Sequence, residues 1–109
     1  MSRKDAVEKL IAELHLMLLH PALFAGENTV LGTQMYFRGV GLALETMGVR
    51  GSLDALIHIQ VIESRGWEFS ANGAVNDMRE RGLSEEQMVQ ELILIEIKTL
   101  EIVVEGLED

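Results

Sequence analysis

The sequence contains no cysteine, so several kinds of site are excluded from the outset. A disulfide framework, a thiolate metal site and a catalytic cysteine all require that residue. The cysteine count leaves the cellular compartment open, and the cytoplasm is the default expectation. The residues after Met1–Asp5 form an amphipathic pattern rather than an uninterrupted apolar run, so no signal peptide is predicted.

Basic residues are also scarce, with 9 Lys and Arg against 18 Asp and Glu, for a net charge of −9. From Ser84 onward there are eight acids and one base, which is −7, whereas the preceding 83 residues carry ten acids and eight bases, which is −2. Direct nucleic-acid binding is disfavoured, because neutralising phosphates requires clustered Lys and Arg. An acidic face can instead dock on a basic protein surface through complementary potentials.

Proline occurs once, as Pro21 after His20. Because the residue before proline avoids the helical region, a helix over 5–19 is expected to end here. The apolar stretch 21–26 is predicted to be a connection that is packed under another element or in an interface. No repeat, low-complexity segment or linker interrupts the chain, and 109 residues most simply form one domain, 1–109.

The stretch 83–109 has the densest apolar content and opens with a helix signal. Ser84 and Gln87 have the spacing of a capping box, in which each side chain accepts from the backbone N–H of the other residue. On a wheel of about 100° per residue, all but one of the large apolar residues that follow fall in an arc of roughly 220°. A helix over 85–107 is therefore predicted to be buried on more than half of its circumference.

Glu96 interrupts this apolar arc, and three interpretations are open. The arc could be only partly buried, so that the carboxylate snorkels to its edge. The carboxylate could have a structural partner, such as an arginine, a histidine or a backbone amide. It could also be a ligand-binding or catalytic group. The last two interpretations share one physical reason, because a buried charge is too costly to keep unpaired.

Residues 29–47 predict a second long helix, which has only two charged residues, Arg38 and Glu45. These two share a narrow polar strip with Gln34. We expect this helix to be central and the most buried in the fold. A membrane span is disfavoured, because the polar residues and glycines lower its hydrophobicity. Small residues on one side predict the close approach of a neighbouring helix: Gly32, Gly39 and Ala43.

Two more helices are predicted over 53–65 and 71–81. Residues 56–62 also alternate in a strand-like way, so the alternative is a hairpin of 56–62 with 67–70, which would make the fold α+β. The Ser-Leu-Asp start at residue 52 favours the helix. Five helices with short connections predict an all-α compact bundle, completed by oligomerisation.

The histidines do not form a metal-binding pattern. Two of them are five residues apart and so lie on different helix faces, and the third, His58, shares its expected face with Arg65, which indicates solvent. Serines 52, 70 and 84 have capping roles, and there is no glycine-rich phosphate motif. No metal and no cofactor is predicted. An enzyme is the less favoured class, with Glu96 as the main candidate for a general base.

Self-association is better supported by the sequence than metal binding or catalysis. The helices over 29–47 and 85–107 carry more apolar surface than a single domain of this size is expected to cover. A large uncovered apolar area marks an interface, and a two-fold dimer is the commonest closed assembly. We therefore expect a homodimer or higher homo-oligomer that forms through these two helices.

The first functional hypothesis is a small, acidic, non-catalytic interaction or regulatory protein. Its C-terminal helix would dock on a basic protein surface, and it could inhibit a nucleic-acid-binding partner by occupying that partner's basic groove. The candidate partner face consists of Glu91, Glu101 and Glu105.

The alternative hypothesis is a helical module that binds a small molecule. An apolar pocket between 29–47 and 85–107 would hold Glu96 as its polar anchor and would favour cationic or amine ligands. The other candidate ligand-binding residues are Thr99, Arg38 and Tyr36. Neither hypothesis includes direct contact with nucleic acid or with a membrane.

Overall fold

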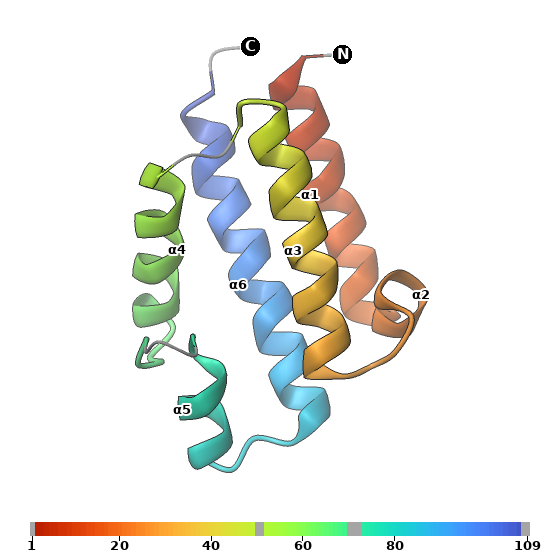
Figure 1. Ribbon diagram of the computed structural model, residues 1–109, viewed down its shortest axis with the longest axis vertical. Coiled ribbons are helices and arrows are strands. Elements are labelled where there is room, and N and C mark those ends of the chain that lie inside the picture. Colours follow the sequence, from red (N-terminus) through yellow and green to blue (C-terminus); the bar gives the residue numbers. More distant parts are fainter. Residues whose placement is uncertain (1, 50–51, 70–72, 108–109) are drawn as a thin grey trace.

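The computed structural model describes residues 2–49, 52–69 and 73–107, and this part of the chain consists of helices without a β-strand (Figure 1). The predicted all-α bundle is confirmed. The helices are α1 (Arg3–Leu19), α2 (Pro21–Ala25), α3 (Val30–Thr46), α4 (Ser52–Ser64), α5 (Val75–Glu80) and α6 (Glu85–Glu105).

α4 settles the choice between a helix and a strand. Residues 56–62 lie inside α4, so the hairpin alternative is wrong for them; its second strand would end at residue 70, which lies outside the described residues. α4 packs on α6, and its Val61 and Ile62 are buried. The alternation of β-branched residues therefore does not mark a sheet, because a helix also brings such residues to a core.

The apolar stretch after α1 is a short helix, so the prediction of a connection at 21–26 was wrong. α2 begins at Pro21, whose missing N–H is no loss in a first helical turn. It ends before Gly26, which has a φ of 82° and serves as a left-handed cap. Phe24 is partly buried against the core, so the expectation that this segment packs under another element is confirmed.

α6 lies at the centre of the bundle, and α1, α3, α4 and α5 all pack on it (Figure 1). Its predicted capping box is present: the Gln87 N–H donates to Ser84 Oγ at 3.1 Å, and the Ser84 N–H donates to Gln87 Oε1 at 2.8 Å. Packing on several sides explains the wide apolar arc. Nine residues of α6 are buried: Met88, Val89, Ile93, Ile95, Glu96, Ile97, Thr99, Leu100 and Val103.

α3 is not the most buried helix, which corrects the prediction for 29–47. Only Val30, Thr33 and Leu44 are buried, and several large apolar side chains face solvent. The reason is its position, because α3 packs on α6 and α2 and its opposite side has no neighbour within the described chain. No described helix, α3 included, is both long enough and apolar enough to cross a membrane.

The glycines of α3 do not serve close helix packing as predicted. A Cβ atom added at Gly39 would meet no atom within 4 Å, so that face is open. A Cβ at Gly32 would come within 2.8 Å of the Glu27 Cγ, which belongs to the loop before α3 rather than to another helix. Gly32 and Gly39 therefore do not mark a contact between helices of one chain.

Candidate functional site: a cavity between α3, α4 and α6

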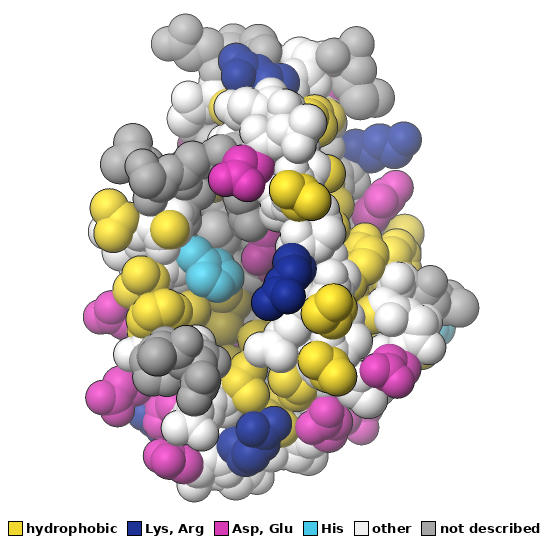
Figure 2. Space-filling view, in the orientation of Figure 1, with side chains coloured by type: hydrophobic (Ala, Val, Ile, Leu, Met, Phe, Trp, Pro, Cys, Tyr) yellow, Lys and Arg dark blue, Asp and Glu magenta, His cyan; other side chains and the backbone are white. Residues whose placement is uncertain are grey.

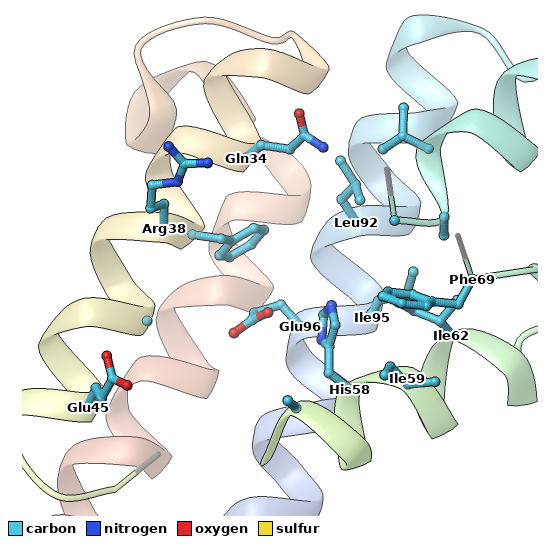
Figure 3. A pocket seen from close by; sticks show the side chains of 16 residues that line it. Gln34, Arg38, Glu45, His58, Ile59, Ile62, Phe69, Leu92, Ile95 and Glu96 are labelled. Atoms are coloured by element: carbon cyan, nitrogen blue, oxygen red, sulfur yellow. The ribbon is translucent and has the colours of Figure 1, made fainter. Parts of the chain in front are cut away.

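A cavity of about 530 Å³ lies between α3, α4 and α6 and extends to the start of α5 (Figures 2 and 3). α3 and α4 both pack on α6 but not closely on each other, so the bundle leaves the space between them open. The volume falls within the range of roughly 300–1,000 Å³ that is typical of small-molecule pockets.

The two sides of the cavity differ in chemistry (Figure 3). Gln34, Arg38 and Glu45 line it from α3, at spacings of four and seven residues that keep them on one helix face. The other side is mostly apolar and is lined by Ile59, Ile62, Phe69, Leu92 and Ile95, with His58 and Glu96 as its polar members. A molecule in the cavity would therefore meet polar groups along one edge and apolar contacts along the other.

Glu96 extends from α6 into this cavity and is only 3% exposed (Figure 3). The interpretation that it snorkels to the edge of a partly buried arc is therefore wrong, because α6 is covered on several sides. Glu96 has at least one further interaction within the chain, as does His58. An ionised carboxylate offers about four acceptor positions, so an internal partner does not exhaust its capacity to accept hydrogen bonds.

His58 extends from α4 into the same cavity and is tied to α6 through Thr99. The buried Thr99 hydroxyl donates to the Ile95 carbonyl oxygen at 2.8 Å, and His58 Nδ1 lies 3.3 Å from the same hydroxyl oxygen. Because the hydroxyl donates to the Ile95 carbonyl oxygen, this contact fits the tautomer of His58 in which Nδ1 carries the proton. In the neutral ring Nε2 is then the acceptor nitrogen.

Two of the four predicted ligand-binding residues, Glu96 and Arg38, line the cavity. Thr99 is buried behind the wall of the cavity and is connected to it by its contact with His58. Tyr36 is not among the lining residues. Its ring packs edge-on against two phenylalanine rings, with centroid distances of 6.5 Å and 5.6 Å. Burial, followed by the nearby Glu13 carboxylate, raises the Tyr36 pKa.

His58 was not predicted to be a cavity residue, because its face of α4 was expected to meet solvent. His58 lies three residues after Ala55 and four residues before Ile62, and all three line the cavity. That helical spacing was present in the sequence, but the alternating β-branched residues obscured it. Gln34 and Glu45 were recognised as a polar strip on α3, without the inference that the strip faces a cavity.

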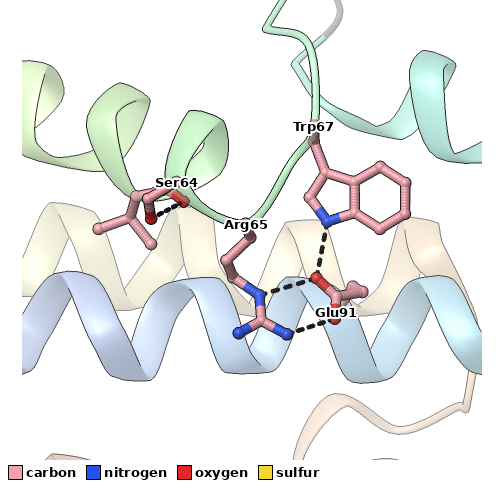
Figure 4. A network of polar contacts seen from close by, with 5 residues as sticks. Ser64, Arg65, Trp67 and Glu91 are labelled. Atoms are coloured by element: carbon pink, nitrogen blue, oxygen red, sulfur yellow. Dashed lines mark hydrogen bonds and ion pairs between the residues drawn. The ribbon is translucent and has the colours of Figure 1, made fainter.

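Glu91 of the predicted partner face is held in a network at the C-terminal end of α4 (Figure 4). Its carboxylate accepts from Arg65 Nε at 2.9 Å and from Trp67 Nε1 at 2.7 Å, and it forms an ion pair with the same guanidinium. The Arg65 hydrogen bonds, and to a lesser degree the Trp67 hydrogen bond, lower the Glu91 pKa against the effect of burial. This glutamate therefore fastens the end of α4 and the following turn to α6.

Glu101 and Glu105, the other two residues of the predicted partner face, are exposed near the C-terminal end of α6. Their use in docking a basic protein stays a prediction. Among the residues in 2–49, 52–69 and 73–107, no group of three or more His, Asp or Glu side chains could hold a metal ion.

In comparisons with models of protein families, with curated proteins and with solved structures, nothing matches this chain. The function is therefore argued from the cavity and its residues.

Proposed function

We propose that this protein binds a small organic cation in the cavity, namely an amine that carries an apolar body. The observation that carries the proposal is Glu96, a buried carboxylate in the wall of a cavity of about 530 Å³. A buried carboxylate attracts a cation more strongly than an exposed one, because water screens the interaction less. The apolar wall of Ile62, Phe69 and Ile95 provides contact for the rest of the ligand.

His58 supports the same ligand class. In the neutral tautomer in which Nδ1 donates to Thr99, Nε2 is an acceptor, as the Glu96 carboxylate is, and His58 has a further interaction within the chain. An ammonium group has three N–H donors and no acceptor, so it complements a site formed by a carboxylate and an imidazole nitrogen. The net charge of −9 also raises the local concentration of cations around the molecule.

The test is isothermal titration of the protein with 2-phenylethylamine, 2-phenylethanol and 3-phenylpropionate. These probes share an aromatic body and differ in the charge of the end group. We expect the amine to bind, the alcohol to bind weakly and the carboxylate not to bind. Glu96→Gln should weaken amine binding by about tenfold or more, because a hydrogen bond to a charged group is lost.

The matched control is Glu101→Gln, which makes the same change of charge on the same helix at an exposed position. It should leave the affinity for the amine unchanged. His58→Gln should weaken binding less than Glu96→Gln does, because it removes no charge in the neutral state. The proposal fails if the alcohol binds as tightly as the amine, if none of the three probes binds, or if both glutamate variants behave alike.

Docking of a basic protein through the acidic outer face of α6 is the second candidate. The exposure of Glu101 and Glu105 favours it, whereas Glu91 is engaged by Arg65 and Trp67. With polylysine as the probe, binding should weaken with added salt and with Glu101→Lys combined with Glu105→Lys. Glu96→Gln should have no effect on it, so the two candidate functions are separated by one set of variants.

A further inference from the structure

The outward side of α3 carries a line of large apolar side chains that the fold leaves in solvent. Leu31, Met35 and Leu42 are 65%, 54% and 65% exposed, and they lie within about 40° of one another around the helix. We call these three residues the α3 stripe. Figure 2 shows hydrophobic side chains along α3 on this face of the molecule. Single exposed leucines are ordinary on protein surfaces, but an aligned set on one helix indicates an interface.

One edge of the α3 stripe carries charges of both signs. Arg38 and Glu45 are seven residues apart, which is two turns or about 10 Å along the helix axis, and they lie on the same side of the stripe. Neither forms a hydrogen bond or an ion pair with another described residue. At this spacing they do not reach each other within the chain, so each can pair with an opposite charge on another surface.

We infer that the α3 stripe is the interface between two copies of this chain, packed as antiparallel α3 helices about a two-fold axis. When two antiparallel helices are related by a two-fold axis and pack face to face, each edge of one helix lies beside the same edge of the other helix. If Arg38 of one copy faces Glu45 of the other, the symmetry imposes the reverse contact, and two ion pairs form together. The axis then passes midway between them, so that Leu42 packs beside its own symmetry mate.

The α3 stripe and its charges favour a second copy over an unrelated partner. The two-fold rotation places each charge of one copy opposite a charge of the other sign on the second copy. Met35 lies farther from the axis than Leu42, and Leu31 lies at the periphery. The interface is narrower than the sequence predicted, because the apolar residues of α6 are largely buried within one chain. This inference does not depend on which ligand occupies the cavity.

Sedimentation velocity from low micromolar to several hundred micromolar protein tests the interface. The wild type should pass from monomer to dimer. Leu42→Gln should raise the dimer Kd by about tenfold or more, Met35→Gln by less, and Leu31→Gln by least, following their distances from the axis. The matched control is Leu56→Gln, a leucine that is 56% exposed on α4 and should leave the Kd unchanged.

Charge reversal tests the register. Arg38→Glu alone and Glu45→Arg alone should each weaken the dimer by about tenfold or more, because like charges then face each other. The double variant, Arg38→Glu with Glu45→Arg, should restore the dimer. The inference is overturned if the wild type stays monomeric throughout, if Leu42→Gln matches the Leu56→Gln control, or if the double variant is no better than the single ones.

Discussion

α3 and α6 are both long and rich in apolar residues, but the fold treats them in opposite ways. Four helices pack on α6, and nine of its residues are buried, including one glutamate and one threonine. α3 has fewer charged residues than α6, yet only three of its residues are buried. Burial is therefore set by how many neighbours a helix has in the bundle, and not by its apolar content alone.

The apolar residues of the two helices also have different roles, in the core for α6 and on the surface for α3. On α6 the apolar residues form the core, and a polar residue among them is a candidate for a site, because retaining it in that position has a cost. On α3 the apolar residues that face outward add nothing to the core of one chain, and a polar residue beside them is ordinary. Glu96 and Arg38 both line the cavity, but only Glu96 is buried.

The largest expected difference in the free energy of unfolding is between side-chain truncations in α6 and in α3. Ile93→Ala, at a fully buried position in α6, should lower the free energy of unfolding by about 2–5 kcal/mol. Leu42→Ala, on the outward side of α3, should cost under about 0.5 kcal/mol in the monomer. Urea denaturation measures both. Equal losses in dilute protein would show that α3 is covered within the chain.

A smaller difference in stability is expected when a glutamate is replaced by alanine in α6 and in α3. Glu91→Ala on α6 removes the acceptor for Arg65 and Trp67 and should cost about 1–3 kcal/mol. Glu45→Ala on α3 should cost under about 0.5 kcal/mol, because Glu45 forms no ion pair with another described residue. Thermal or urea unfolding of the two variants distinguishes them. A similar cost at both positions would contradict the structural role given to Glu91.

The Glu91 network also predicts a dependence of stability on pH. The pKa of Glu91 is lowered in the folded state, so its contribution is fully present above the ordinary glutamate pKa of about 4.3 and is lost as the pH falls through the folded pKa. The advantage of the wild type over Glu91→Gln should be constant near neutral pH and shrink in this acidic range. Urea titrations at a series of pH values measure this stability advantage. An advantage that grows on acidification would contradict a lowered pKa of Glu91 in the folded state.

The smallest expected effect has the opposite sign. Gly39→Ala on α3 places a Cβ atom where no atom lies within 4 Å, and alanine favours a helix over glycine by roughly 0.5–1 kcal/mol. The variant should therefore raise the stability of the monomer by about that amount. Thermal unfolding in dilute protein is the measurement. A loss of stability would mean that this side of α3 has a close neighbour.

The pattern of α6 was predictable because two of its signals agree. The Ser84–Gln87 capping box and the wide apolar arc indicate one long, well-covered helix, and the structure has both, whereas the burial of Glu96 was left open by the sequence. α4 was predicted as a helix against a competing strand pattern. Its short length and its β-branched residues left only the capping signal at its start to decide between the two.

The cavity was predicted only in part: a pocket between 29–47 and 85–107 with Glu96 in it was expected, whereas the wall that α4 contributes was not. α3 and α4 share α6 as a neighbour without packing closely on each other, and no residue pattern in either helix encodes that separation. Arg38 was expected at the pocket, but the polar strip that it forms with Gln34 and Glu45 was not predicted to line it as a whole. The expected burial of α3 failed because a low number of charges was taken to mean a central position.

The central position of α6 also has a consequence for synthesis of the protein. α6 is the last helix along the described chain, and α1, α3 and α4 each bury their apolar residues against it. A ribosome-bound chain that ends before Leu83 lacks the helix on which α1, α3 and α4 pack, although α2 can already contact α1 and α3. The apolar faces of the earlier helices that pack on α6 therefore stay exposed until α6 itself has left the exit tunnel.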